Sequence, residues 1–320
     1  MRENPGSVIA QPIATPVTAT PVTATPVTAT PLASKHQTTV HDGRTYHVGV
    51  KVNEVANRII TVGDPKRALK IAVHLDTRVF THESKRGFTT ITGTYKGVAV
   101  SLVAIGMGTP MADMMVREIR EVVSGPILLI RFGSCGGIGD KTRVGMMTVS
   151  KDGAVGVSRN YDYFEPMYSG VAPDASSEQG PYLISKICPA DSQLSDELMN
   201  SLCKCLGEES VLSGLNATAD SFYSSQGRQD PGFNDYNSDL IEVIRKKYPN
   251  CETLEMESHM LLHLARCATF KSPDAGIRAA ACAMVFADRN TNAFIAPETV
   301  HQLEDKASIA ILDALVSCPM

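Results

Sequence analysis

The chain has 320 residues, of which 43% are hydrophobic and 20% charged, a balance typical of a globular protein. Its net charge of -4 gives no reason to expect nucleic acid or a membrane as partner, so a bound anion must be met by locally placed arginines. The eight cysteines include no CxxC pair, and the longest wholly apolar run, residues 279–287, is too short to span a bilayer. We expect a cytoplasmic protein with reduced thiols and no metal centre.

The first forty residues differ from the rest in composition. The pentapeptide ATPVT occurs three times between residues 14 and 28, and a related ATPLA follows. A proline in every fifth position removes backbone donors and favours extended conformers, and the repeat offers little apolar surface to bury. We therefore expect residues 1–40 to form a disordered low-complexity tail and residues 41–320 to form one folded domain.

After the tail, strand and helix patterns alternate. Runs rich in β-branched residues predict strands, and apolar residues at helical spacing predict helices. The predicted strands are 58–62, 89–95, 98–105, 127–130, 144–149, 211–216 and 278–286, and the predicted helices are 111–123, 192–206, 237–247, 257–269 and 298–316. The second and third strands form a hairpin, and 127–130 is buried on both faces. The pattern predicts an α/β fold, a single domain with a central mixed β-sheet flanked by helices.

Three glycine-rich turns are predicted at strand ends, where such sheets bind ligands. In GDPKR, residues 63–67, glycine lets backbone amides approach an anion and Arg67 adds a charged fork, although an ordinary turn before a helix explains it equally well. The second turn is GMGTP, residues 106–110. In the third, IRFGSCGGIGD (130–140), Arg131 beside a core strand is costly unless paired; a phosphate would pair it, and Ser134 adds a hydroxyl. None of the three matches a dinucleotide or ATP-binding loop.

The third turn has a second interpretation, a cysteine nucleophile. Residues 133–137, GSCGG, fit G-x-C-x-G, a nucleophile elbow with cysteine in place of serine. An elbow runs from a strand directly into a helix, whereas the residues that follow here have turn and strand character. Nothing aligns the aspartate and histidine of a triad. We favour a small residue in a tight turn for Cys135 and keep a cysteine hydrolase as an alternative.

SFYSSQGRQD, residues 221–230, places an aromatic ring, an amide and a guanidinium within seven residues. A surface loop is the simple interpretation of this stretch alone. The alternative is a pocket for a planar polar ring, stacked by Phe222 and read at its edge by Gln226 and Arg228.

EMES, residues 255–258, places two carboxylates beside an apolar helical run. The pattern is typical of an acidic first helical turn, or it places Glu257 on the two hydroxyls of a ribose. His259 and His263 have a spacing that can bind zinc, but without the glutamate of HExxH we interpret them as packing residues.

In chain order, GDPKR, RGFTT (86–90), GMGTP, IRFGSCGGI, SFYSSQGRQD, EMES and ADRNT (287–291) resemble the motifs of the nucleoside phosphorylase-I family. The resemblance runs from about His47 to the last helix and excludes the tail. It implies a pentosyltransferase of pyrimidine salvage that converts uridine and phosphate reversibly to uracil and ribose 1-phosphate. It implies no cofactor, because inorganic phosphate is a co-substrate.

The resemblance also implies a role for individual residues. The implied phosphate ligands are Gly63, Arg67, Arg86, Arg131 and Ser134, the ribose ligands His47, Met256 and Glu257, and the base ligands Phe222, Gln226 and Arg228. Of these, Arg131, Gln226 and Arg228 are the implied catalytic residues. Because Arg86 and His47 of such enzymes enter the neighbour's pocket, the resemblance implies a homo-oligomer, at least a dimer, with shared sites.

Two positions depart from the family pattern. Gly87 replaces a glutamate that bacterial members use at a cation site between subunits, so we do not expect that cation. Asp288 stands where pyrimidine enzymes usually have asparagine, and purine members use an aspartate near this strand end to bind N7. Asp288 therefore indicates either purine activity or an ion pair with Arg289. A purine nucleoside phosphorylase, a nucleosidase and a non-catalytic nucleoside sensor are the remaining alternatives.

Overall fold

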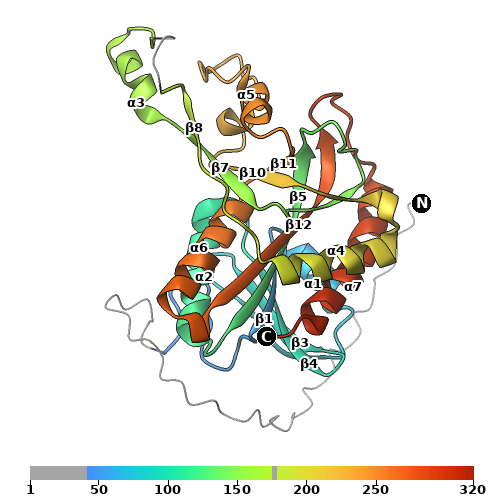
Figure 1. The fold of residues 1–320 in the computed structure, drawn as a ribbon. Coiled ribbons are helices and arrows are strands. Elements are labelled where there is room, and N and C mark those ends of the chain that lie inside the picture. The colour runs from blue at the N-terminus through green and yellow to red at the C-terminus, as the bar shows by residue number, and fades with distance from the viewer. Residues whose placement is uncertain (1–41, 175–178) are drawn as a thin grey trace, which may run out of the picture.

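The computed structural model of the protein describes residues 42–174 and 179–320 (Figure 1). The predicted tail, residues 1–40, lies outside the described residues. Within them, twelve strands form one mixed sheet whose main path runs β2-β3-β4-β1-β5-β11-β10-β7-β8, while β12 pairs with β5 and β6, and β6 pairs with β9.

The bounds of the elements are as follows. The strands are β1 Arg58–Val62, β2 Thr77–Glu83, β3 Thr89–Tyr95, β4 Val98–Ala104, β5 Ile127–Gly137, β6 Met147–Val149, β7 Ala154–Arg159, β8 Tyr182–Ile184, β9 Val211–Ser213, β10 Leu215–Ala219, β11 Cys251–Glu255 and β12 Ile277–Asp288. The α-helices are α1 Pro65–Ala72, α2 Thr109–Val122, α3 Tyr161–Phe164, α4 Ser192–Leu206, α5 Leu240–Lys247, α6 Ser258–Lys271 and α7 Pro297–Ser317.

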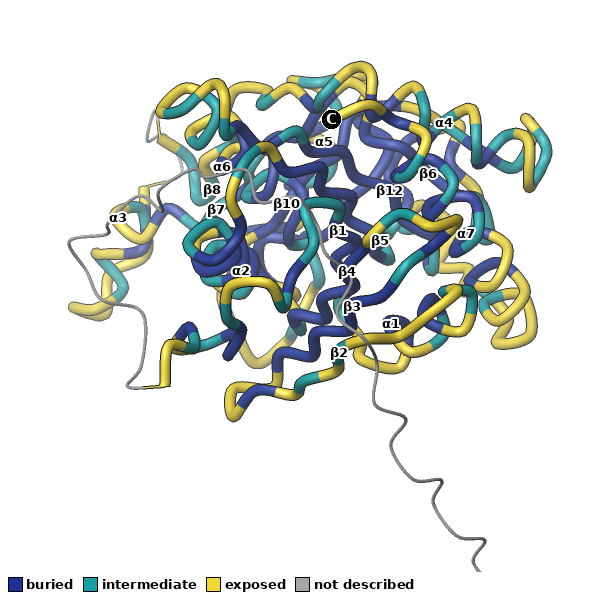
Figure 2. The backbone as a smooth tube through the Cα atoms, turned by 90° about the horizontal axis from the view of Figure 1, so that it is seen from below, coloured by how far each residue is buried: buried dark blue, intermediate teal, exposed yellow. Residues whose placement is uncertain are grey.

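Helices cover both faces of the sheet, as an α/β architecture requires. Successive side chains of β1 and β5 point to opposite faces. Ile60 and Ile130 pack with α1, α4 and α7, whereas Ile59 and Leu129 pack with α2 and α6. Figure 2 shows the result, with dark, buried strands between helices that are exposed on their outer sides. None of the helices in the described part of the chain has the length and apolar character needed to cross a membrane.

The regular elements follow the sequence pattern closely. The strand at 58–62 and the helix at 192–206 have the predicted bounds, and β3 and β4 form the predicted hairpin around Lys96 and Gly97. The predicted strand 211–216 is instead two strands, β9 and β10, separated at Gly214. β9 pairs with β6, whereas β10 pairs with β7 and β11.

The prediction of a turn at residues 130–140 is wrong, because β5 continues in extended conformation to Gly137. Its glycines serve close packing instead of chain reversal. A Cβ at Gly136 would lie 3.1 Å from the side chain of Arg289, and one at Gly137 would lie 2.6 Å from that of Thr142. Any larger residue at these positions would push away the side chains that cross the strand.

Candidate active site

One edge of β5 is paired with β12 along its length, but the opposite edge has an unpaired stretch at the centre of the sheet. Pairing with β1 ends at Thr61 and Arg131, and pairing with the antiparallel β11 begins only at Gly136. We call residues 132–135 of this edge the β5 notch. Because β1 stops at Val62, side chains reach the notch from both faces of the sheet. A change of partner of this kind beyond a strand's carboxyl end is where α/β sheets bind ligands.

Arg131 reaches the notch from the α2–α6 face. Its side chain lies across two glycines, since a Cβ on Gly63 would be 3.6 Å from Nη2 and one on Gly133 would be 3.7 Å from Nε. Nη2 donates to Glu257 Oε2 at 2.7 Å, and both residues are buried. Nε and Nη1 are buried too, and neither has a hydrogen-bond partner among residues 42–174 and 179–320. Buried guanidinium donors of this kind are costly, and an anion would satisfy them.

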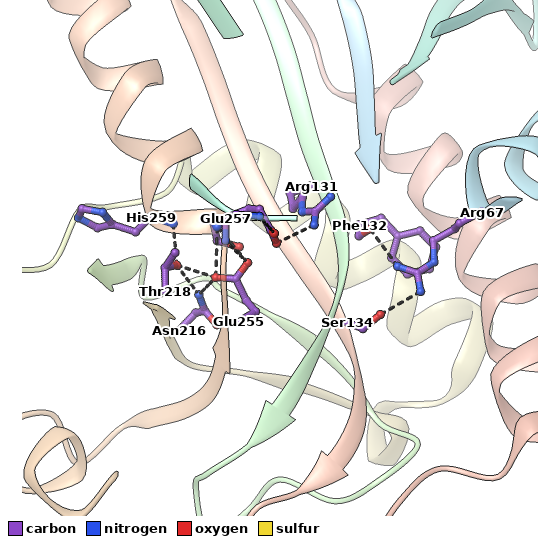
Figure 3. A network of polar contacts seen from close by, with 11 residues as sticks. Arg67, Arg131, Phe132, Ser134, Asn216, Thr218, Glu255, Glu257 and His259 are labelled. Atoms are coloured by element: carbon purple, nitrogen blue, oxygen red, sulfur yellow. Dashed lines mark hydrogen bonds and ion pairs between the residues drawn. The ribbon is translucent and has the colours of Figure 1, made fainter. Parts of the chain in front are cut away.

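Glu257 is fixed by the turn between β11 and α6. Its Oε1 accepts the backbone N–H of Gly108 at 2.6 Å, at the start of α2. The neighbouring Glu255 ends β11 and accepts from the N–H groups of Glu257 and Ser258 and from the side chains of Asn216 and Thr218 (Figure 3). Burial, and then the charge of Glu257, raise the pKa of Glu255. The expected ribose ligand is therefore held rigidly, and Met256 lies half-buried beside it.

Arg67 and Ser134 lie on the other face of the sheet, the one covered by α1 and α7. Arg67 Nη2 donates to Ser134 Oγ at 2.9 Å, and Nε donates to Glu304 Oε1 at 3.0 Å. The guanidinium lies 5.1 Å from the ring centroid of Phe132, and burial lowers its pKa. Figure 3 shows the two arginines beside β5, each with its own partner. The expected phosphate ligands thus approach the notch from opposite faces, and after burial the positive charge of Arg131 also lowers the pKa of Arg67.

Phe222, Gln226 and Arg228 lie in the loop that follows β10. Arg228 stacks its guanidinium 4.2 Å from the Phe222 ring centroid and donates from Nε to the Phe222 carbonyl at 3.1 Å. Gln226 is buried, whereas Phe222 is exposed. Arg228, expected to read the edge of a base, thus covers one face of the Phe222 ring, and the Tyr223 ring packs edge-on with its centroid 5.2 Å from that of Phe222.

Arg289 directly follows β12 and lies near this loop. The sequence interpretation did not assign it to the site. Its Nη2 donates to the backbone carbonyl of Gln226 at 3.0 Å, and Nη1 is buried without a partner in the described ranges. Burial, and then the positive charge of Arg228, lower the pKa of Arg289. Two features of the sequence could have indicated Arg289. It stands at the end of a predicted strand, and the predicted strand 127–130 is followed by glycines.

The ion pair with Arg289, one of the two alternatives for Asp288, is absent from the described residues. The Asp288 carboxylate instead accepts the N–H groups of Asn290 and Thr291 at 2.8 and 3.4 Å. Burial raises the pKa of Asp288, but these bonds outweigh it and leave the pKa below its ordinary value. Asp288 also lines an open pocket of about 560 Å³ with Asp140 and Arg143, to which no residue of the expected base loop contributes.

His47 and Arg86 lie together, apart from these groups. His47 Nδ1 is 2.6 Å from Oε1 of Glu118, in the third turn of α2. Arg86 is exposed and lies 5.7 Å from the ring centroid of Tyr46, whose ring packs edge-on against His47. Glu118 is nine residues beyond Thr109, so a rise of 1.5 Å per residue places it about 14 Å along α2 from the end near Glu257.

Cys135 lies inside β5, so the elbow geometry of the hydrolase alternative is absent. Its Sγ contacts Thr148 Oγ1 at 3.9 Å and the Met284 carbonyl at 3.5 Å. Burial raises the pKa of the thiol to about 12, opposite to the shift that a nucleophilic cysteine needs. Cys135 is a buried packing residue of the strand.

Comparison with known proteins identifies the class. Residues 57–317 match the Phosphorylase superfamily. The uridine phosphorylase of Thermococcus kodakarensis is 28% identical over 267 residues, which cover 82% of this chain and 83% of that protein. The DeoD-type purine nucleoside phosphorylase of Geobacillus kaustophilus is 40% identical over 98 residues, which cover 31% of this chain and 41% of that protein.

A solved structure agrees with this classification. It comes from a study of two uridine phosphorylases of the oomycete Phytophthora capsici, and it matches with a TM-score of 0.81 at 38% identity over 88% of this chain and 97% of that chain. The chain belongs to the phosphorylase superfamily. It is a pentosyltransferase of the nucleoside phosphorylase type, as the motifs predicted.

Proposed function

We propose that this nucleoside phosphorylase cleaves uridine with inorganic phosphate, giving uracil and ribose 1-phosphate. The observation that carries the proposal is the environment of the base loop. Gln226 is buried and Arg228 and Arg289 converge beside it, whereas Asp288 is tied to its own turn. Uracil offers two carbonyl oxygens and one N–H, which an amide and guanidinium groups match. The relatives named uridine phosphorylase support the same substrate.

In this proposal phosphate binds at the β5 notch. The unpartnered Nε and Nη1 of Arg131 face it from one side, and Arg67 and Ser134 approach from the other. Glu257 and Met256 hold the ribose, with Glu257 accepting from its hydroxyls. A phosphate oxygen attacks the anomeric carbon while the bond from that carbon to N1 of uracil breaks. Fixed placement of the two reactants supplies much of the rate.

The electron pair of the broken bond leaves with uracil, and its charge spreads onto the carbonyl oxygens. Arg228 and Arg289 place two positive charges beside the loop that would hold the base. Positive groups fixed in advance stabilise charge that develops in the transition state more than charge already present in the substrate. The uracil anion then takes a proton from solvent.

We propose further that two subunits share each active site. Within one chain, His47 is held by Glu118, a residue about 14 Å along α2 from the end near Glu257, so we place it outside the ribose site of its own subunit. The exposed group formed by Tyr46, His47 and Arg86 is therefore placed to serve a second copy. His47 would bind the 5′-hydroxyl of the ribose there, and Arg86 the phosphate.

A purine nucleoside phosphorylase is the second candidate, because relatives with that name match 98 residues at 40% identity. Initial rates with uridine, thymidine and inosine at saturating phosphate distinguish the two. We expect uridine cleavage to exceed inosine cleavage, Gln226→Ala to impair uridine cleavage strongly, and Asp288→Asn to leave it largely intact. Inosine cleaved as fast as uridine, and lost selectively in Asp288→Asn, would reverse the base assignment.

A further inference from the structure

A buried carboxylate on α2 holds the histidine that we assign to the ribose. Glu118 is only 2% exposed. Its Oε2 accepts the N–H groups of His47 and Val48 at 2.9 and 2.7 Å, and its Oε1 lies 2.6 Å from Nδ1 of the His47 ring. Across the described part of the chain, no lysine or arginine forms an ion pair with Glu118. The carboxylate therefore binds the 47–48 segment.

This arrangement determines which ring nitrogen carries the proton. A carboxylate only accepts hydrogen bonds, so the 2.6 Å contact requires a hydrogen on Nδ1 of His47. In the neutral ring, Nε2 then has a free lone pair and is an acceptor. The His47 side chain is 32% exposed, so its ring is not enclosed within its own subunit.

We propose that Glu118 is a positioning residue that fixes the His47 tautomer, so that Nε2 accepts the hydrogen of the ribose 5′-hydroxyl in the neighbouring subunit's site. The proposal rests on the function proposed above, in which two subunits share a site. It makes a chemical distinction at the 5′ position. A hydroxyl can donate to Nε2, whereas a fluorine in its place presents lone pairs to the lone pair of the ring and is rejected.

Glu118→Gln tests the proposal, because the amide has the shape of the carboxylate but can donate. Its oxygen at the Oε2 position keeps the N–H groups of His47 and Val48, whereas its NH₂ faces Nδ1 and loses the second contact of the His47 N–H, at 2.9 Å. The ring then carries its hydrogen on Nε2, which tolerates fluorine. We expect the kcat/KM ratio of uridine to 5′-deoxy-5′-fluorouridine, measured at pH 8, to fall on the order of tenfold in the variant, the size of one hydrogen bond.

Two further measurements complete the test. The ¹⁵N shifts of the His47 ring should report hydrogen on Nδ1 in the wild type and on Nε2 in Glu118→Gln. Asp113→Asn is the matched control, since Asp113 lies on the same helix in an exposed ion pair with Arg117. It should leave the substrate ratio unchanged.

The proposal is overturned if the wild-type ring carries its hydrogen on Nε2, a result that does not depend on whether any variant folds. An unchanged substrate ratio in a folded Glu118→Gln variant, or an equal drop in Asp113→Asn, also overturns it. A wild type that releases no uracil would refute the proposed function instead, and the ring shifts would still decide the role of Glu118.

Discussion

Removing the Arg131 side chain should have two separable consequences. Its Nη2 neutralises Glu257 at 2.7 Å in a buried pair, and its other donors face the β5 notch without a partner in the described residues. Arg131→Ala leaves the Glu257 charge buried, and among the described residues only the Gly108 N–H then donates to its carboxylate. Breaking a buried pair from one side costs about 3–5 kcal/mol in the free energy of unfolding.

The second consequence concerns phosphate. Loss of one charge-assisted partner costs about 1.5–3 kcal/mol of binding, which corresponds to a rise of roughly tenfold to 150-fold in half-saturating phosphate. Urea unfolding measures the first effect, and initial rates against phosphate concentration measure the second. The loss of stability and the loss of phosphate affinity are thus measured independently.

A double variant separates stability from binding. Arg131→Ala with Glu257→Gln removes the unpaired buried charge at position 257, so we expect it to regain on the order of 1–3 kcal/mol of the lost stability. It should not regain phosphate affinity. If Arg131→Ala alone unfolds at the wild-type urea concentration, the buried pair with Glu257 does not stabilise the fold. If its phosphate dependence is unchanged, Arg131 does not bind phosphate at the notch.

Three further predictions follow from other parts of the structure. Cys135→Ala should retain phosphorolysis, because the thiol is a packing group whose pKa is raised to about 12; loss of activity on selective alkylation in a folded protein would restore the hydrolase interpretation. Mixing Arg86→Ala and Arg131→Ala subunits, each impaired alone at low phosphate, should restore activity there, since one site of a hybrid dimer carries neither defect; hybrids that form and stay impaired would contradict shared sites. Asp191 caps α4 and pairs with Arg278; burial raises its pKa, but the bonds from Arg278 and from the cap outweigh this and lower it. Its stabilisation is therefore present above the unfolded pKa of about 3.9 and lost as the pH falls through the lower folded value. Asp191→Asn should cost about 1 kcal/mol at pH 7 and less below pH 4, and a cost that is the same at pH 3 would show that the charge plays no part.

The sequence predicted the architecture and singled out Arg131, because a charge on a core strand has few structural explanations. It could not predict that β5 continues through its glycines. Glycine in a turn and glycine beneath a crossing side chain look alike in sequence, and the side chain above Gly136 comes from Arg289, far along the chain. For the same reason the sequence does not indicate the hydrogen bond from Arg289 to Gln226 or the one from Arg67 to Glu304, because each joins residues that are far apart in the chain.

Glu118 had a local signal that the sequence interpretation passed over. The predicted helix places its apolar residues at 111, 114, 115, 119, 122 and 123, and position 118 falls on the same stripe, four residues from 114 and from 122. A carboxylate on an apolar stripe needs a partner. The partner is the 47–48 segment, which precedes the first strand and has no periodicity that would place it against a helix.

In the proposed reaction phosphate, and not water, displaces the base. The most direct measurement is chromatography of protein incubated with uridine in the presence and absence of inorganic phosphate, with uracil and ribose 1-phosphate both quantified. We expect uracil to appear only with phosphate and in equal amount to ribose 1-phosphate. Equal release of uracil in phosphate-free buffer, with free ribose as the second product, would contradict it.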